Sequence, residues 1–244
     1  MSLCKYISSQ KLAHKWQFLS ILGTGLQGIV FKVLEIKTGL IYAMKCLLDE
    51  IIIPPKIFTL QQYITHNDMA DKVLKCYILT DDSSQQVWID SYIRDLDIEY
   101  DMVVVTIHKY YEFTFNTIFK RTDRLTKIGL AFELLYGMHK LHEKGVIHGD
   151  IHKGNIMIDI VDHVRCYQLN NKEYIVRSKY KPVFIDFNLA KTPDHNRGPC
   201  ITPSRDRYDL SNIIGSLLDY NLFIILINGQ YNVIPPSMLW NILQ

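Results

Sequence analysis

One loop and one later carboxylate constrain this chain more than any other feature. Residues 148–155 read His-Gly-Asp-Ile-His-Lys-Gly-Asn, which is the pattern H-x-D-x-x-x-x-N. Further along, an apolar run ends in Asp186, within the sequence Phe-Ile-Asp-Phe-Asn. Phosphoryl transfer from a nucleotide needs one carboxylate that orients or deprotonates the acceptor hydroxyl. It also needs an amide and a second carboxylate that hold divalent ions on the phosphates. Asp150, Asn155 and Asp186 supply these three groups in order.

The other half of such a site is expected upstream. Residues 22–30 read Leu-Gly-Thr-Gly-Leu-Gln-Gly-Ile-Val, the pattern G-x-G-x-x-G-x-V, and Tyr-Ala-Met-Lys follows at 42–45. A glycine-rich turn between antiparallel strands lets backbone N–H groups approach phosphates without interference from a Cβ atom. Lys45 on the next strand can reach the same phosphates as a point charge. A Rossmann fingerprint is the alternative, but it requires a helix after the glycines, and here a β-branched strand follows.

Four motifs therefore occur in order: the glycine-rich loop, A-x-K, H-x-D-x-x-x-x-N and D-F-x. In this combination the chain resembles the eukaryotic-type protein kinase superfamily over about residues 16–190. The resemblance implies an α+β, bilobal protein-kinase-like fold with an antiparallel-sheet N-lobe and a reduced, mainly helical C-lobe. We expect a single kinase-like domain over residues 1–244, with the N-lobe at 1–107 and the C-lobe at 108–244.

The resemblance also implies the cofactors and the residues that hold them. ATP is the expected nucleotide, and Mg²⁺ the expected ion, with Mn²⁺ as an alternative. Asn155 and Asp186 are the expected metal ligands. The catalytic set is Asp150, Asn155, Lys45 and His152. The nucleotide-binding set is Leu22, Gly23, Thr24, Gly25, Leu26, Gln27, Gly28, Val30, Ala43 and Lys45.

Sequence patterns predict most of the elements between these motifs. Strands are expected at 18–22, 29–35, 40–47, 73–79, 101–107, 156–158 and 182–185, with an added hairpin at 164–169 and 173–176. Helices are expected at 55–65, 113–121, 124–143 and 210–218. The 124–143 helix has the clearest apolar periodicity, and Gly145 closes it. Asp206 or Asp209, placed just before the last helix, is expected to hold the catalytic loop.

Four departures from the kinase pattern matter. Between Glu50 and Glu99 there is no glutamate that could pair with Lys45, so Gln61 or Gln62 takes the expected position. Gly149 replaces the arginine that usually pairs with an activation-loop phosphate, which predicts activity without that switch. His152 stands where serine/threonine kinases carry lysine. Asn188 replaces the glycine of D-F-G, although asparagine tolerates a left-handed backbone better than most residues.

Composition excludes several classes of protein. Hydrophobic content of 48% and charged content of 21% are ordinary for a globular protein, and a net charge of +2 favours neither nucleic acid nor a membrane surface as a partner. The five cysteines are widely spaced and include no C-x-x-C, which favours free thiols. No signal peptide is evident, and the longest apolar run, at 222–227, is too short to cross a bilayer. We expect a cytoplasmic protein, in a host cell if the chain is viral.

The leading hypothesis is an ATP- and Mg²⁺-dependent serine/threonine protein kinase with Asp150 as its catalytic base. The sequence leaves the protein substrate and the oligomeric state open.

The form H-G-D-x-H is similar to aminoglycoside and choline phosphotransferases, so a small-molecule phosphotransferase is the nearest alternative. A nucleotide-binding pseudokinase scaffold is another, favoured by the missing glutamate and by Asn188. A metal hydrolase built on H-x-D-x-H would leave the glycine loop and Lys45 unexplained. The compact form also resembles kinases of large DNA viruses or bacterial effectors.

Overall fold

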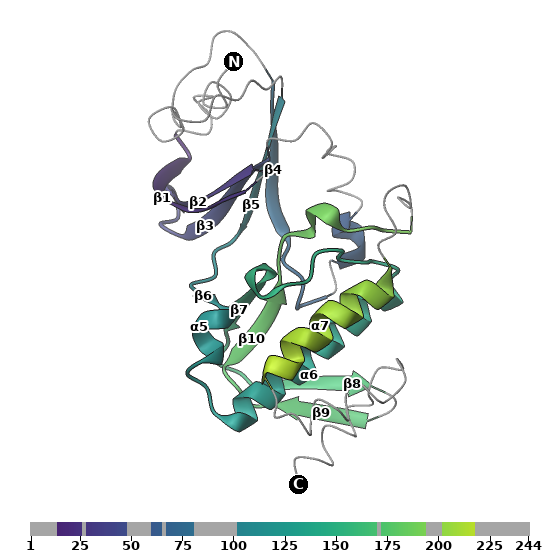
Figure 1. The fold of residues 1–244 in the computed structure, drawn as a ribbon. Coiled ribbons are helices and arrows are strands. Elements are labelled where there is room, and N and C mark those ends of the chain that lie inside the picture. Colours follow the sequence, from purple (N-terminus) through teal and green to yellow (C-terminus); the bar gives the residue numbers. More distant parts are fainter. Residues whose placement is uncertain are drawn as a thin grey trace. The chain divides into compact units, whose positions relative to one another are not determined.

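The computed structural model describes residues 14–25, 28–47, 60–64, 67–80, 102–169, 172–193 and 202–217. The chain divides into two compact units (Figure 1). Unit 1 comprises Met1–Gln61 and Lys72–Tyr110, and unit 2 comprises Gln62–Asp71 and Tyr111–Gln244. The chain therefore leaves unit 1, contributes a short segment to unit 2, and returns before it crosses finally at Tyr110.

Unit 1 is built on a five-stranded antiparallel sheet with the order β1-β2-β3-β5-β4 (Figure 1). Its strands are β1 (Trp16–Gly25), β2 (Gly28–Glu35), β3 (Ile41–Leu47), β4 (Val73–Thr80) and β5 (Met102–Lys109). All five were predicted, the first three from their β-branched and aromatic content and β5 from its continuous apolar run, and the structure confirms them with small shifts at the ends. A turn at 36–38 begins the connection between β2 and β3.

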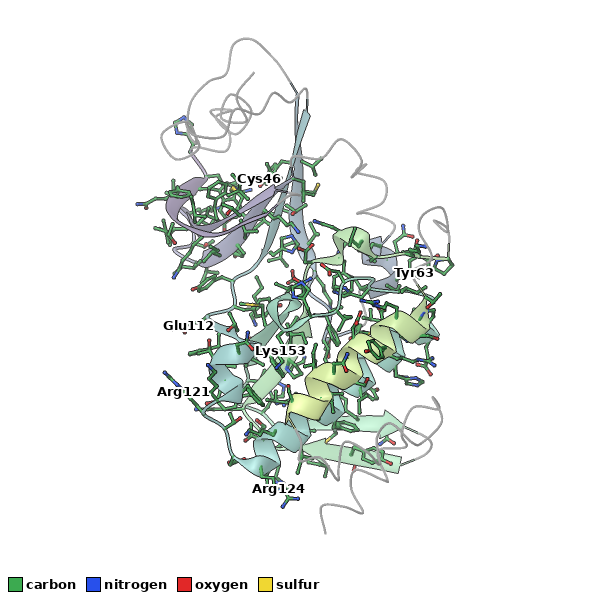
Figure 2. All side chains as sticks on the ribbon, in the orientation of Figure 1. Cys46, Tyr63, Glu112, Arg121, Arg124 and Lys153 are labelled. Atoms are coloured by element: carbon green, nitrogen blue, oxygen red, sulfur yellow. The ribbon has the colours of Figure 1, made fainter. Side chains whose placement is uncertain are left out.

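The two faces of this sheet differ in chemistry. Ile29, Phe31 and Val33 of β2 alternate onto one face and are buried, together with Met44 and Cys46 of β3. Figure 2 labels Cys46 at this position in the sheet. The intervening positions of the two strands hold Val30, Ala43 and Lys45, three residues predicted to bind nucleotide, and these therefore lie on the other face.

Residues 60–64 are helical, which agrees with the C-terminal part of the helix predicted at 55–65. The remainder of that prediction lies outside the described residues. Gln61 accepts a hydrogen bond at Oε1 from the backbone N–H of Val73, at 3.1 Å. Its amide therefore helps to hold the start of β4.

Unit 2 contains short sheets and two long helices. Its elements are β6 (Phe113–Thr114), α5 (Phe115–Phe119), α6 (Arg124–Glu143), η1 (Lys153–Asn155), β7 (Ile156–Ile160), β8 (Arg165–Leu169), β9 (Lys172–Val176), β10 (Tyr180–Phe184), η2 (Phe187–Leu189) and α7 (Pro203–Leu217). The strands β10, β7 and β6 form one antiparallel sheet, and β8 pairs with β9 as the predicted hairpin. Helices α6 and α7 pack side by side (Figure 1).

Helix α6 has the predicted bounds, and local chemistry explains both ends. The carboxylate of Asp123 accepts from the N–H of Thr126 at 2.7 Å and caps the start of the helix. Beyond the last turn, Gly145 adopts a left-handed φ of 72°, which glycine tolerates without strain. A Cβ at Gly145 would lie 2.6 Å from Cγ of Pro193, so the glycine also allows Pro193 to pack closely.

The segment 67–71 is bound into unit 2 by backbone pairing. Ala70 forms a parallel bridge with Phe184. The N–H of Phe184 donates to Met69 O at 2.7 Å, and the N–H of Asp71 donates to Phe184 O at 2.8 Å. The amide of Asn67 donates to the carbonyl of Gly137 in α6 at 3.0 Å. These bonds fix the segment beside the end of β10.

A buried ion pair holds the inserted hairpin β8–β9 against α6. Arg165 makes a bidentate contact with the carboxylate of Glu133, through Nε to Oε1 and through Nη2 to Oε2. The hydroxyl of Tyr167 donates to the same carboxylate at 2.6 Å. Glu133 is fully buried, and burial raises the pKa of its carboxyl even beside the guanidinium. The rings of Phe132, Tyr136, Tyr167 and Tyr174 pack around this pair.

Two predicted helices need correction. The helix predicted at 113–121 is the short strand β6 followed by α5, because Thr114 caps a single helical stretch that ends at Phe119. The last helix begins at Pro203 rather than Leu210, so Asp206 and Asp209 lie within α7 and not before it. Proline suits the first turn of a helix, because the backbone N–H groups there have no acceptor within the helix and the lack of one costs nothing.

No helix in the described part of the chain has the length and apolar character needed to cross a bilayer.

Candidate active site

The predicted catalytic loop is held from α7 by one buried carboxylate. Asp206 is fully buried, and it accepts the backbone N–H of His148 at 2.7 Å and that of Gly149 at 2.8 Å. Nε2 of His142, at the end of α6, lies 3.1 Å from the same carboxylate. Of the two candidates that the sequence left open, Asp206 is therefore the residue that holds the loop. Asp209 instead pairs with Arg205 on the helix surface, at 2.7 Å.

His148 joins the loop to the strand that carries Asp186. Its Nε2 lies 2.9 Å from the carbonyl of Ile185, which can only accept, so Nε2 carries the proton. Its Nδ1 accepts the N–H of Asp150 at 3.3 Å. The ring is fully buried, with Phe187 at 4.5 Å between ring centroids. Burial lowers the pKa of His148, and a neutral ring is the form that both hydrogen bonds require.

Asp150 and Asn155 form the centre of the loop. The Nδ2 of Asn155 donates to the carbonyl of Asp150 and to its Oδ2, both at 3.0 Å. The side chain of Asp150 keeps 43% of its surface exposed, whereas Asn155 is buried. The asparagine amide therefore fixes the direction of a carboxylate that an acceptor can still reach. Lys153 between them packs on α5, with its Nζ 5.4 Å from the ring centroid of Phe119 (Figure 2).

The backbone of Ile185 carries Asp186 to this loop. Its N–H donates to the carbonyl of Asn155 at 3.0 Å, and its carbonyl is bonded by His148. Asp186 has a φ of 61° and a ψ of 67°, and it is the only non-glycine residue in the described part of the chain with a positive φ. A left-handed backbone in a residue other than glycine is costly and persists where the surroundings impose it. The sequence expectation placed the backbone constraint at Asn188, whereas the structure places it at Asp186.

Gly149 has a structural reason that the sequence did not reveal. Its φ is 82°, in the region that glycine tolerates and most residues do not. Its N–H also donates to Asp206. The loop therefore needs a left-handed backbone at position 149, and this gives a structural reason for glycine in place of the usual arginine.

Unit 1 presents the residues expected around a nucleotide on one face of its sheet. The register pairs Val30 with Lys45 and Lys32 with Ala43, and paired residues in an antiparallel sheet share a face. Val30 and Ala43 therefore lie on the same face as Lys45, as predicted. Across the glycine-rich turn, Gly25 pairs with Gly28. A Cβ at Gly28 would lie 2.0 Å from the carbonyl oxygen of Cys46, so only glycine allows this approach.

The structure thus brings the predicted site residues together in two groups. Asp150, His152, Asn155 and Asp186 lie on or beside the catalytic loop of unit 2. The strands β1, β2 and β3 of unit 1 carry the described members of the nucleotide-binding set, which are Leu22, Gly23, Thr24, Gly25, Gly28, Val30, Ala43 and Lys45. The other two members, Leu26 and Gln27, fall outside the described residues. Sequence reasoning missed the contact of His142 with Asp206. A histidine at the end of the helix before the loop was the available signal for His142.

Comparison with known proteins gives the family. The family model described as protein kinase domain matches residues 16–192, which is most of the chain. The chain belongs to the protein kinase family. No curated protein gave a significant match to it. Family membership supports phosphotransferase activity in general, together with nucleotide binding, and members of the family generally use ATP and Mg²⁺.

The residues present suit a magnesium ion. Both hydrogen bonds of the Asn155 side chain use Nδ2, and its Oδ1 and the carboxylate of Asp186 are the hard oxygen donors that Mg²⁺ prefers. The described residues contain no group of three or more His, Cys, Asp or Glu side chains arranged for a metal ion. Mg²⁺ is commonly bound by only one or two carboxylates, with substrate phosphates and water completing its shell.

Proposed function

We propose that this chain is an ATP- and Mg²⁺-dependent phosphotransferase that acts on serine and threonine hydroxyls of proteins. The observation that carries the proposal is the loop geometry. The carboxylate of Asp150 is partly exposed, and one of its oxygens is held by Asn155. A carboxylate with one oxygen held and the other available is suited to accept a proton from a hydroxyl group.

Each residue has a stated part in the reaction. Asp150 accepts the proton of the acceptor hydroxyl as that oxygen forms a bond to the γ-phosphorus and the bond from the γ-phosphorus to the β-phosphate oxygen breaks. Lys45 contributes a positive charge toward the α- and β-phosphates. Asn155 and Asp186 would hold Mg²⁺, which when bound neutralises charge on the phosphates. The glycine-rich turn offers backbone N–H groups to the same phosphates.

A small-molecule phosphotransferase is the second candidate, and one observation favours it. Helix α7 begins at Pro203, only 17 positions after Asp186, and no A-P-E sequence occurs in or after this interval. In protein kinases the A-P-E motif and the activation loop lie after D-F-G. The short interval and the form H-G-D-x-H are both more like enzymes with small acceptors. A pseudokinase has less support, because Asn188 lies in η2 and needs no left-handed backbone.

The test is transfer of labelled γ-phosphate from ATP, with Mg²⁺ or Mn²⁺, to generic proteins and to a panel of aminoglycosides and choline. Asp150→Asn should lower kcat by about 10²–10⁴-fold. Asp162→Asn, at a fully exposed position on the β7–β8 turn, is the matched control and should retain wild-type activity. Transfer to protein serine or threonine would support the leading proposal, and transfer only to small molecules would replace it. ATP binding without any transfer would favour the pseudokinase.

A further inference from the structure

His152 caps the short helix η1 through one of its two ring nitrogens. The N–H of Gly154 donates to Nδ1 of His152 at 3.1 Å. Because an N–H group can only donate, Nδ1 must be the unprotonated nitrogen, and the proton of the neutral ring lies on Nε2. The second ring nitrogen is therefore a hydrogen-bond donor, and its position decides what else the ring can do.

Gly154 also fixes where the ring lies. A Cβ built on Gly154 would be 2.9 Å from both Cε1 and Nδ1 of His152, which is closer than real Cβ contacts. Gly154 does not have a left-handed φ, so the backbone itself would accept alanine. An alanine at position 154 would therefore push the imidazole, the end of a flexible and half-exposed side chain, out of the place that it occupies.

The free donor of this ring faces the proposed catalytic base. Nε2 of His152 lies 3.6 Å from Oδ2 of Asp150, the same oxygen that accepts Nδ2 of Asn155 at 3.0 Å. The longer contact exceeds a normal hydrogen bond, although catalytic hydrogen bonds are often long before substrate binds and shorten in the complex. Two donors therefore lie near the same oxygen, Oδ2 of Asp150.

We propose that His152 is a positioning residue for Asp150, and that Gly154 sets both the location and the tautomer of its ring. This inference rests on the proposed function, since it assigns to Asp150 the proton of the acceptor. In it, the Nε2–H of His152 and the amide of Asn155 hold Oδ2, so that Oδ1 keeps the direction needed to accept the hydroxyl proton. A carboxylate turned away by an ångström would lose up to about a hundredfold in rate.

The capping and positioning roles use different nitrogens, so two substitutions separate them. His152→Asn keeps an acceptor for the N–H of Gly154, because asparagine is a strong cap residue, but it has no group at the place of Nε2. His152→Gln extends an amide N–H toward that place. His163→Asn, at an exposed histidine on the β7–β8 turn, is the matched control.

The first experiment measures kcat and KM for these variants with the acceptor that the transfer assay identifies. We expect His152→Asn to lower kcat by about 10–100-fold with KM for ATP within twofold, and the thermal midpoint to stay near that of the wild type. His152→Gln should recover part of the loss, and His163→Asn should change nothing. Full activity in His152→Asn would overturn the proposal, because capping would then be the only role of the ring.

A double-mutant cycle tests the part assigned to Gly154. Gly154→Ala should lower kcat in the wild-type background, because the added methyl group displaces the ring. The same change in a His152→Ala background should cost little, because no ring remains to be displaced. Equal losses of kcat in the two backgrounds would show that Gly154 acts on the loop independently of His152, and would overturn this part of the proposal.

A spectroscopic test does not depend on turnover or on the variants. Long-range ¹H–¹⁵N spectra of the wild-type protein should show His152 with its proton on Nε2 and an unprotonated Nδ1. A proton on Nδ1 in the neutral ring would contradict the geometry. The two proposals also fail separately. Undiminished transfer by Asp150→Asn would refute the proposed function, whereas loss in Asp150→Asn beside full activity in His152→Asn would refute only the role of His152.

Discussion

Two buried carboxylates each hold a segment of unit 2, the catalytic loop or the β8–β9 hairpin, and they do so with different partners. Asp206 on α7 accepts the backbone N–H groups of His148 and Gly149, whereas Glu133 on α6 binds the guanidinium of Arg165 and the hydroxyl of Tyr167. Both acids are fully buried. The backbone donors around Asp206 cannot be removed by changing a side chain, so that attachment can be broken only at Asp206. The attachment at Glu133 can be broken from either side.

The two carboxylates therefore have different roles. Asp206 supports the loop that carries the proposed base, whereas Glu133 supports the fold of unit 2. The contacts of Asp206 with the loop backbone end two residues or fewer from Asp150, so a shift there moves the proposed base. The Glu133 contacts end on the inserted hairpin, which carries none of the predicted site residues. We therefore expect damage at Glu133 to appear in the free energy of unfolding and damage at Asp206 to appear in both stability and rate.

The largest effect is expected from Arg165→Met. Removing the guanidinium leaves the carboxylate of Glu133 buried without its charge partner, which typically costs about 3–5 kcal/mol of unfolding free energy. Urea unfolding measures this cost. The double variant Glu133→Leu/Arg165→Met should recover most of it, because an apolar pair of similar volume removes the buried charge. The kcat of the folded protein should stay within a few-fold of wild type in both variants. A hundredfold loss of kcat would contradict a purely structural role for Glu133 and Arg165.

Asp206→Asn should cost less stability and more activity. One carboxylate oxygen becomes an NH₂ group, so one backbone N–H of the loop loses its acceptor, at a cost of about 1–3 kcal/mol. The loop then shifts, and kcat should fall by about 10–100-fold. Asp209→Asn, three positions along the same helix, breaks only the contact with Arg205 and should leave kcat unchanged. Equal kinetic losses in the two variants would show that α7 matters to the loop only as a whole helix.

The pH dependence of the free energy of unfolding tests whether the buried ring of His148 is neutral in the folded protein. The pKa of His148 is lowered by burial, while in the unfolded chain it returns to about 6.5. Below that pH the unfolded chain binds a proton that the folded chain does not, so stability falls as the pH falls. The slope contributed by this group is at most about 1.4 kcal/mol per pH unit. Urea unfolding between pH 7.5 and about pH 5, without added Mg²⁺, should give a shallower slope for His148→Gln than for wild type; parallel slopes would contradict the assignment.

The smallest effect is expected from Asn188→Gly, which restores the D-F-G sequence. Asn188 lies in η2 without a positive φ, so glycine gains no conformational advantage and costs about 0.5–1 kcal/mol through backbone entropy. We expect kcat within twofold of wild type in the same transfer assay. A tenfold rise would mean that Asn188 weakens the enzyme, and it would reopen the pseudokinase hypothesis.

The sequence predicted the elements whose signals are local. Runs of β-branched and aromatic residues placed β1, β2 and β3, and the three- and four-residue steps of Leu125 to Leu141 placed α6 at its observed bounds. The motif order placed Asp150 and Asn155 on one loop. These features depend on residues that are close in the sequence, and the spacing of apolar residues predicts such local structure well.

Features that depend on distant contacts were beyond the sequence. Nothing local distinguishes Asp206 from Asp209, because the choice depends on which one faces the backbone of residues 148 and 149. The pairing of Glu133 with Arg165 joins residues on separate elements, and each alone looks like an ordinary surface charge. The start of α7 was missed because residues 203–209 lack the apolar run that begins at Leu210, although Asp206 among them is fully buried.

The backbone pairing of Ala70 with Phe184 has a consequence for synthesis on the ribosome. These partners are 114 positions apart in the chain (184 − 70). At about 5–20 residues per second, translation needs roughly ten seconds to extend the chain from one to the other. Throughout this interval the segment 67–71 has been synthesised, whereas the end of β10 that pairs with it has not. The nascent chain must keep this edge from pairing elsewhere until translation has passed Phe184.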